Sequence, residues 1–283
     1  MAATIIDGRE AAARVRAQVA REVEVLVSET GRRPGLATIL VGDDPASEIY
    51  VRNKRKASTE VGIADFHRHL PADAEQEEVA ALIEEFNHNP DVSGILLQLP
   101  VPEGLDGPAL TGIIAPDKDV DGLTPISAGR LAQHLPGLRP CTPLGILELL
   151  DSHGVALEGA EAVVIGRSNL VGRPMAVLLV HRSATVTVCH SRTRDLPGVC
   201  SRADVLVAAI GRPRLIGPQY VKRGAVVIDV GINRTDEGLV GDVDFEPVAE
   251  RASLVTPVPG GVGPMTPAML LRNTVLAAGL QAG

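Results

Sequence analysis

The sequence has few aromatic residues and few cysteines. Of its 283 residues only 2% are aromatic, and tryptophan is absent. Its hydrophobic cores must therefore consist of aliphatic side chains, the composition expected of buried parallel strands covered by helices. The three cysteines, Cys141, Cys189 and Cys200, are an odd number without the spacing of a disulfide framework, and the first residues lack the pattern of a secretory leader. We therefore expect a reduced, cytoplasmic protein.

Positive charge and long hydrophobic runs are also scarce. The formal net charge of -8 argues against the concentrated Lys and Arg that bind a nucleic-acid backbone. No apolar run reaches the roughly 20 residues that a helix needs to span a bilayer. The histidines lack zinc-site spacing, and His67 and His69 flank one arginine, a pattern more common for surface residues of a strand. We expect no nucleic-acid partner, no membrane partner and no bound metal.

What the chain contains instead is a regular alternation of strand and helix patterns, and its length suffices for two domains. Helical patterns cover 9–30, 45–61, 74–89, 144–153, a segment from 172 and 264–280, and strand patterns cover 36–42, 64–70, 93–100, 161–166, 185–190, 205–211 and 225–231. A region punctuated by Pro and Gly, 116–143, lies between the two runs. The alternation predicts the α/β fold class, with parallel sheets and right-handed crossovers.

The segment AVVIGRSNLVGRP, 162–174, has the pattern of a strand, a tight turn and the start of a helix. A doubly wound fold binds a pyrophosphate at such a turn, where the helix N-terminus offers free N–H groups. Gly166 and Gly172 frame the turn, and Ser168 stands where a second glycine is usual, so its hydroxyl is available to a phosphate. The same glycines also fit a turn that binds nothing, so both interpretations stay open.

The end of the next strand pattern indicates which dinucleotide fits. An NAD site places Asp or Glu there to accept from the ribose hydroxyls. This strand instead ends in VCHSRT, with Ser191, Arg192 and Thr193 and no acid before Asp195. Those groups suit a 2′-phosphate, with Arg167 as a further cation. The sequence therefore predicts NADP as the cofactor.

Tyr50 and Lys54 share a helix face because they are four residues apart, and Ser47 lies one turn earlier. In short-chain dehydrogenases this spacing carries a phenol that exchanges a proton with a substrate hydroxyl. In that class, however, the glycine-rich turn precedes the pair, whereas here the pair comes long before it. A solvent-facing helix without a function produces the same letters.

Two further side chains in the first half invite a functional interpretation. Gln98 interrupts the apolar segment GILLQLP, and a buried amide must find partners or cost a few kcal/mol. The segment PDKDVDG, 116–122, imitates a calcium loop, but its twelfth position is Ala128 where a bidentate Glu is needed. Calcium is rejected, which leaves a sharp turn that presents Asp121, or a solvated turn.

The loop TPVPGGVGPMTP, 256–267, combines three glycines with four prolines before a helix. A plain linker does not need this composition. Backbone that approaches a flat ligand closely would explain it.

Together these segments resemble one family. The strings YVRNKRKA, GILLQLPVP, PDKDVDG, PCTP, VVIGRSNLVGRPMA, ATVTVCHSRT, VVIDVGIN and TPVPGGVGPMTPAML are similar, in the same order, to the bifunctional methylenetetrahydrofolate dehydrogenase/methenyltetrahydrofolate cyclohydrolases. The resemblance implies NADP-linked oxidation of 5,10-methylenetetrahydrofolate, followed by hydrolysis of the methenyl product to 10-formyltetrahydrofolate. It also implies a homodimer with a folate substrate.

The resemblance further implies a fold and a set of site residues. The fold has two α/β domains with a cleft between them: residues 1–120, joined by the helix 265–283, bind folate, and residues 140–264 form a Rossmann-type parallel sheet that binds NADP. The implied site residues are Tyr50, Lys54, Gln98 and Asp121 at the active site, Arg167, Ser168, Ser191 and Ile232 at NADP, and Pro259, Gly260 and Gly261 with Tyr50 and Asp121 at the folate. The patterns described above add Gly166 and Arg192 to the NADP site.

The chemistry assigns different roles to these side chains. Hydride loss from a carbon between two nitrogens mainly needs positioning, whereas hydrolysis needs a group that moves protons. We expect Lys54 to be that group, with its pKa lowered by partial burial or a nearby cation, Gln98 to orient it and Tyr50 to pack on the folate. Asp121 would accept from the pterin N–H groups. A dehydrogenase without the hydrolysis activity and a non-catalytic NADP-binding protein are the alternatives.

Overall fold

The computed structural model describes residues 2–282 and divides the chain into two compact units. The N-terminal unit contains Arg14–Cys141 and the chain from Pro267 onward, and the C-terminal unit contains the chain up to Ala13 and Thr142–Thr266. Residues 2–13, which the sequence prediction placed in the first domain, therefore lie in the second. The reason is strand pairing: β1 (Thr4–Ile5) pairs in parallel with β11 (Leu254–Val255).

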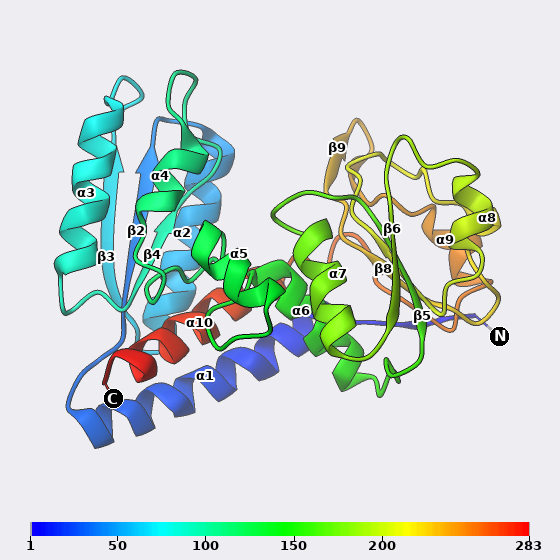
Figure 1. Ribbon diagram of the computed structural model, residues 1–283, viewed down its shortest axis with the longest axis horizontal. Helices are drawn as coiled ribbons and strands as arrows, with labels where there is room; N and C mark the ends of the chain where they lie inside the picture. Colours follow the sequence, from blue (N-terminus) through cyan, green and yellow to red (C-terminus); the bar gives the residue numbers. More distant parts are fainter. Residues whose placement is uncertain (1, 283) are drawn as a thin grey trace. The chain divides into compact units, whose positions relative to one another are not determined.

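A three-stranded parallel sheet forms the centre of the N-terminal unit (Figure 1). Its strand order is β3-β2-β4, with β2 at Gly35–Val41, β3 at Ala64–Leu70 and β4 at Gly94–Leu97. Every residue of β2 and β4 is buried, as expected of strands that are covered on both faces. The helices are α1 (Gly8–Thr30), α2 (Pro45–Glu60), α3 (Gln76–His88), α4 (Gly107–Ile113), α5 (Pro125–Ala132) and α10 (Met265–Ala282).

The short helices α4 and α5 lie within or beside the region that the sequence prediction left without elements. Each begins with a capping residue followed closely by proline: Asp106 accepts from the Ala109 N–H, and Thr124 accepts from the Ser127 N–H. Such caps satisfy backbone donors that the first turn of a helix leaves unpaired.

The predicted strand 93–100 is shorter than expected, because it ends at Leu97.

The C-terminal unit contains a six-stranded sheet in which all pairs are parallel, with strand order β1-β11-β8-β7-β5-β6. The strands are β5 (Glu161–Ile165), β6 (Thr185–Cys189), β7 (Val205–Ala208), β8 (Val226–Asp229), β1 and β11. Its helices are α6 (Cys141–Ser152), which begins at the unit boundary, α7 (Gly172–His181), α8 (Leu196–Cys200), α9 (Phe245–Ala249) and the 3-10 turn Pro218–Tyr220. An antiparallel hairpin joins β9 (Asn233–Thr235) to β10 (Gly238–Val240). The predicted Rossmann-type parallel sheet is confirmed.

The strand order of this sheet determines where a ligand fits. The chain passes from β5 to β6 on one side and then continues at β7, which pairs with the other side of β5. Open α/β sheets bind ligands outside the carboxyl ends of their strands at such a switch point. The turns after β5, β7 and β8 are therefore where a dinucleotide is expected.

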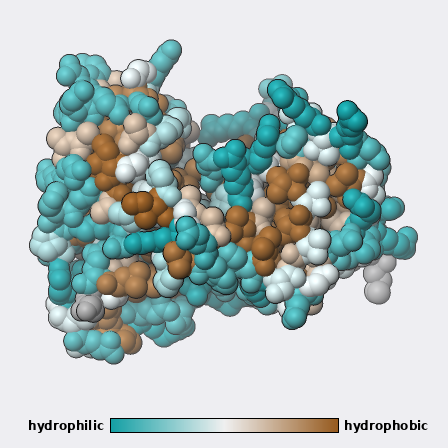
Figure 2. Space-filling model, in the orientation of Figure 1, coloured by the Kyte–Doolittle hydropathy of each residue, from teal (hydrophilic) through white to brown (hydrophobic). Residues whose placement is uncertain are grey.

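The surface shown in Figure 2 is mainly hydrophilic, with hydrophobic side chains in small groups. None of the helices in 2–282 is both long and apolar enough to cross a membrane. Within the same residues, no three His, Cys, Asp or Glu side chains are grouped so that they could hold a metal ion.

Candidate active site and dinucleotide site

Helix α2 carries Tyr50 and Lys54 on one face. Asp44 caps the helix by accepting from the Ser47 N–H at 2.8 Å, and Pro45 occupies its first turn. Tyr50 is 48% exposed, whereas Lys54 is partly buried. The lysine is thus partly covered by the protein, whereas the neighbouring tyrosine ring is accessible and free to contact a ligand.

Lys54 and Gln98 contact each other. The Lys54 Nζ donates to Gln98 Oε1 at 2.9 Å, and Gln98 Nε2 donates to the Leu99 carbonyl at 2.6 Å. The second bond fixes the orientation of the amide, so its oxygen must face the lysine. The Gln98 N–H also continues the pairing of β4 by donating to the Ile39 carbonyl at 2.9 Å. A rigid strand end therefore positions the lysine.

The loop 116–122 is anchored by three consecutive side chains, two of which are acids of its calcium-loop pattern. Asp117 pairs with Arg130 at 2.7 Å. Lys118 is buried and donates to the carbonyls of Phe86 and Asn89 at the end of α3. Asp119 accepts from two backbone N–H groups ahead of α5. Because each side chain points to a different partner, no shared cation site forms.

This anchoring presents Asp121. Burial raises the pKa of the Asp121 carboxyl, the charge of Lys54 opposes that shift, Asp119 adds to it, and a hydrogen bond from the Cys141 thiol opposes it. Gly122 follows with a φ of +68°, and a Cβ there would lie 2.4 Å from the Arg139 carbonyl carbon. The turn thus requires glycine next to the carboxylate, and Lys54, Gln98 and Asp121 belong to the same unit.

The turn between β5 and α7 is a tight backbone cradle in the C-terminal unit. A Cβ on Gly166 would lie 2.1 Å from the Ala209 carbonyl oxygen, and a Cβ on Gly172 would lie 2.2 Å from the Gly166 carbonyl oxygen. Ser168 Oγ accepts from the N–H groups of Val171 and Gly172, at 3.2 and 3.4 Å. Because that oxygen already accepts twice, its O–H is left to donate. A turn of this kind fits a pyrophosphate.

The turn after β6 exposes the side chains that suit a 2′-phosphate. Thr193 Oγ1 accepts from the His190 N–H at 2.9 Å, so it supports the turn, while Ser191 and Arg192 are exposed. Neither the Arg192 guanidinium nor that of Arg167 has a hydrogen-bond or ion-pair partner among residues 2–282. Two unpaired guanidinium groups follow the ends of adjacent strands, so the residues present fit a phosphorylated dinucleotide.

Ile232 and the loop 257–261 complete the predicted set. Ile232 follows β8 and is 52% exposed. Gly260 has a φ of +112° and lies against the Arg9 side chain, and a Cβ on Gly8 would meet the Gly261 carbonyl oxygen at 1.7 Å. The loop therefore packs so closely on the start of α1 that position 8 must be glycine, a contact that the sequence interpretation missed. Arg9 is far from this loop in sequence, so no local pattern indicated it.

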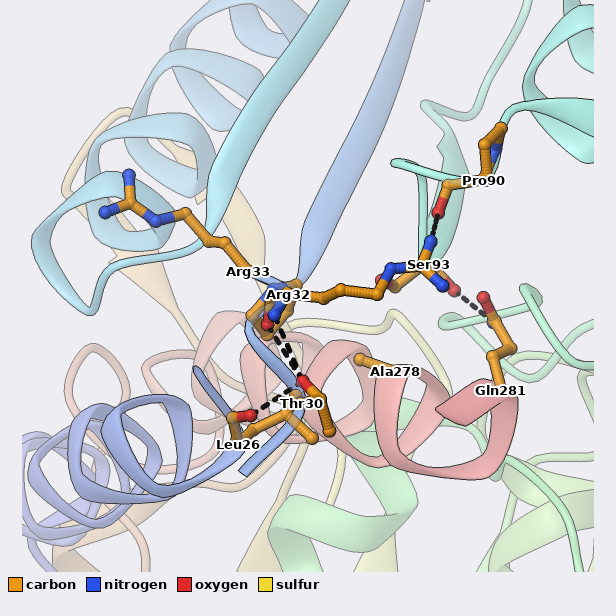
Figure 3. Close-up of a pocket in the computed structure, with 9 residues that line it drawn as sticks. Leu26, Thr30, Arg32, Arg33, Pro90, Ser93, Ala278 and Gln281 are labelled. Atoms are coloured by element: carbon orange, nitrogen blue, oxygen red, sulfur yellow. Dashed lines mark hydrogen bonds between the residues drawn. The ribbon is translucent and has the colours of Figure 1, made fainter. Parts of the chain in front are cut away.

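One pocket in the N-terminal unit is lined by Arg32, Pro90, Ser93 and Gln281, among others, and none of the predicted site residues lines it (Figure 3). Its volume of about 20 Å³ holds a single water molecule. Arg32 donates to the Pro90 carbonyl at 2.5 Å and Gln281 donates to the Ser93 carbonyl at 2.9 Å, so its polar groups bind one another. The pocket is a packing gap and not a substrate site.

Comparison with known proteins identifies the family. Residues 6–121 match the family model described as tetrahydrofolate dehydrogenase/cyclohydrolase, catalytic domain, and residues 140–282 match the model of its NAD(P)-binding domain. The chain belongs to the tetrahydrofolate dehydrogenase/cyclohydrolase family. The family resemblance inferred from the sequence is thereby confirmed.

Individual relatives cover almost the whole chain. The bifunctional protein FolD 2 of Frankia alni is 66% identical over 278 residues, 98% of this chain and 96% of that protein. The crystal structure of the bifunctional FolD of Campylobacter jejuni has a TM-score of 0.96 at 47% identity and covers 99% of each chain. The FolD of Trypanosoma brucei, complexed with NADP cofactor and an inhibitor, has a TM-score of 0.93 at 39% identity, covering 99% of this chain and 98% of that one.

Proposed function

We propose that this protein oxidises 5,10-methylenetetrahydrofolate with NADP and then hydrolyses the methenyl product to 10-formyltetrahydrofolate. Membership of the family carries the two activities, because the relatives of highest identity described above are bifunctional. The observation that carries the chemistry is the hydrogen bond between Lys54 and Gln98, in the same unit as the Asp121 carboxyl on which the charge of Lys54 acts. The substrate is a folate, and the pathway is one-carbon metabolism.

Oxidation mainly needs positioning. When bound, NADP accepts the hydride, and the remaining cation is stabilised by the two nitrogens that flank the carbon. Gly166 and Gly172 let the backbone approach the pyrophosphate, and Ser168 donates its O–H to it. Arg167, Ser191 and Arg192 bind the 2′-phosphate, and Ile232 packs against the dinucleotide. These side chains bind and orient, and none of them exchanges a proton with the substrate.

Hydrolysis requires proton transfer, which we assign to Lys54. Water must lose a proton as it attacks the methenyl carbon, and a leaving nitrogen must gain one. A neutral amine that donates one N–H to Gln98 Oε1 still has its lone pair free to accept a proton from water. Because the amide is held by Leu99, Gln98 fixes the direction of that lone pair. Gln98 is therefore a positioning residue and Lys54 the acid/base.

Tyr50 and Asp121 hold the folate. The accessible phenol ring of Tyr50 packs on an aromatic part of the substrate, and the Asp121 carboxylate accepts from the amino and ring N–H groups of the pterin. The loop with Pro259, Gly260 and Gly261 contacts the folate through its backbone. Tyr50 needs no proton-transfer role, because neither reaction involves a substrate hydroxyl that must be deprotonated.

Replacing Asp121 by Ala should weaken folate binding by about tenfold or more, because charge-assisted hydrogen bonds contribute about 1.5–3 kcal/mol each. NADP binding should be unchanged.

Because burial raises the pKa of Asp121, acid should weaken folate binding at a higher pH than for an ordinary aspartate. Folate titrations of both proteins across pH test this. Normal folate affinity in the variant would remove the assigned role.

One assay tests the proposed function. Purified protein is mixed with methylenetetrahydrofolate and NADP, and NADPH formation and then the decay of methenyl absorbance are followed in one cuvette. We expect both signals. NADPH without methenyl decay would identify a dehydrogenase alone, and neither signal despite NADPH binding would identify a non-catalytic binding protein. Replacing NADP by NAD should lower the rate strongly, and equal rates would contradict the role of the arginines.

We further propose that the protein is a cytoplasmic homodimer formed through the edge of the six-stranded sheet. Among residues 2–282, strand β6 pairs with β5 alone, and Val188 on β6 and Val180 on α7 are 40% and 55% exposed. Figure 2 shows hydrophobic surface over α7 and β6. An exposed edge strand without charged side chains favours pairing with another chain.

Replacing Val188 by Lys should therefore convert the dimer into a monomer at micromolar concentration, because a charge on an edge strand opposes pairing. Sedimentation velocity measures the change. Val25→Lys is the matched control, because Val25 is 53% exposed on α1 and belongs to the other unit. A Val188→Lys protein that sediments as wild type would exclude this edge as the interface.

A further inference from the structure

Two buried carboxylates in the C-terminal unit have no part in the reactions described above. Asp229 ends β8 and is 3% exposed, and Asp242 follows β10 and is fully buried. Buried acids are costly unless hydrogen bonds satisfy them. Their partners are the turns at the carboxyl ends of β7 and β8, where the sheet order places the dinucleotide.

Asp242 binds three consecutive backbone N–H groups after β7. Its Oδ2 accepts from Ile210 at 2.7 Å and from Gly211 at 3.0 Å, and its Oδ1 accepts from Arg212 at 2.8 Å. Gly211 has a φ of +68°, which turns successive N–H groups toward one point. Such amide concavities bind anions. Here the chain fills its own concavity with a carboxylate.

The same carboxylate also holds the segment after β8. Asp242 Oδ1 accepts from the Asn233 side-chain amide at 2.9 Å, so one residue contacts the turns after both strands. Asp229 in turn holds Asp242, by accepting from its backbone N–H at 2.9 Å and from the N–H groups of Gly231 and Val243. The packing is tight, because a Cβ on Gly231 would lie 2.3 Å from Asp242 Oδ1.

We propose that Asp242 is a positioning residue for NADP: it holds the turn 210–212 and the segment 230–233 in the arrangement that the dinucleotide requires. This inference rests on the proposed function. The turn after β7 is continuous with Ala209, whose carbonyl oxygen is the atom that a Cβ on Gly166 would strike. The segment after β8 carries the exposed Ile232. Asp242 therefore connects two walls of the predicted dinucleotide site without touching the ligand.

Asp242→Asn tests the inference with little change of shape. Each oxygen of Asp242 accepts from two N–H donors. In either orientation of the asparagine amide, its NH2 group would therefore replace an acceptor and face two N–H donors. We expect the dissociation constant for NADPH, measured by calorimetry, to rise roughly tenfold to a hundredfold, because buried N–H groups of the turn lose their acceptor and the turn must shift. In the ligand-free protein, amides 210–212 should lose protection from hydrogen exchange.

Comparison of the two activities separates positioning from support of the fold. The KM for NADP should rise, while hydrolysis of methenyltetrahydrofolate, which consumes no NADP, should stay near wild type. Asp244→Asn is the matched control, because Asp244 lies two residues away and its side chain makes no capping bond to α9. An equal loss of both activities, or unchanged NADPH affinity in a folded Asp242→Asn protein, would overturn the inference.

A second variant decides the matter if Asp242→Asn does not fold. Asn233→Ala removes one of the four donors and leaves the backbone bonds in place, so it should raise the NADPH dissociation constant several-fold, and an unchanged value would overturn the inference. Failure of the proposed function is recognised separately. It would show in the wild-type protein itself, as absence of NADPH binding or of one or both activities.

Discussion

Replacing Lys54 by Met should abolish hydrolysis of methenyltetrahydrofolate and leave NADP reduction measurable. Methionine keeps most of the side-chain length but cannot accept or donate the proton that water and the leaving nitrogen exchange. General acid–base catalysis contributes roughly 10²–10⁴-fold, so the hydrolysis rate should fall by about that factor. Oxidation should fall less, because it needs the lysine only for positioning. Stopped-flow absorbance of the methenyl product measures the loss.

Lys56→Met is the control for this experiment. Lys56 lies on the same helix, but its side chain is 76% exposed and 3.8 Å from Glu60. Its replacement should change neither activity. If the Lys54→Met protein hydrolysed the methenyl substrate at the wild-type rate, the acid/base would have to be another group.

Replacing Gly166 by Ala should abolish NADP binding at accessible concentrations. The new methyl group would lie 2.1 Å from a backbone oxygen of Ala209, and Gly166 has a φ of +126°, which L-residues rarely adopt. The turn must therefore shift, and the N-terminus of α7 shifts with it. We expect oxidation to fall by about 10² or more, as follows a displacement of about 1 Å. NADPH calorimetry and the rate of NADP reduction measure the effect.

Gly159→Ala separates the close contact from the unusual backbone. Gly159 also has a positive φ, +73°, but a Cβ there meets nothing within 4 Å. This variant should lose some thermal stability and keep its NADP affinity. Wild-type NADP affinity in Gly166→Ala would mean that the turn after β5 does not bind the pyrophosphate.

Elements with strong local signals could be predicted from the sequence. The strand at 64–70 has the predicted bounds, and α2 ends at Glu60, one residue before the prediction. For the helix the signal is local, because a capping residue and a proline begin it and Gly62 follows its end. The strands β1 and β11 could not be predicted, because each has only two residues, and β1 pairs with β11 from the other end of the chain.

The site was predictable as a set of residues but not as a set of contacts. An amide at the end of an apolar strand signals that Gln98 needs a partner, yet nothing in the sequence says that the partner is Lys54. Asp242 gave no signal at all, since an acid between glycine and valine reads as a surface turn. Asp242 is buried because the turn after β7, which is distant in sequence, packs against it and donates to its carboxylate.

The division of the chain into two units limits how the protein can be taken apart. The boundary is crossed after Ala13, after Cys141 and after Thr266, so neither unit is one continuous stretch. A single cut after Cys141 would leave the first fragment without the segment from Pro267 onward, and the second without β1. Asn273 donates to the carbonyls of Val120 and Arg139, so the first fragment would also expose unpaired backbone acceptors. Separate expression of the two activities from contiguous fragments should therefore fail, and a nick at this position should inactivate both unless the pieces stay together.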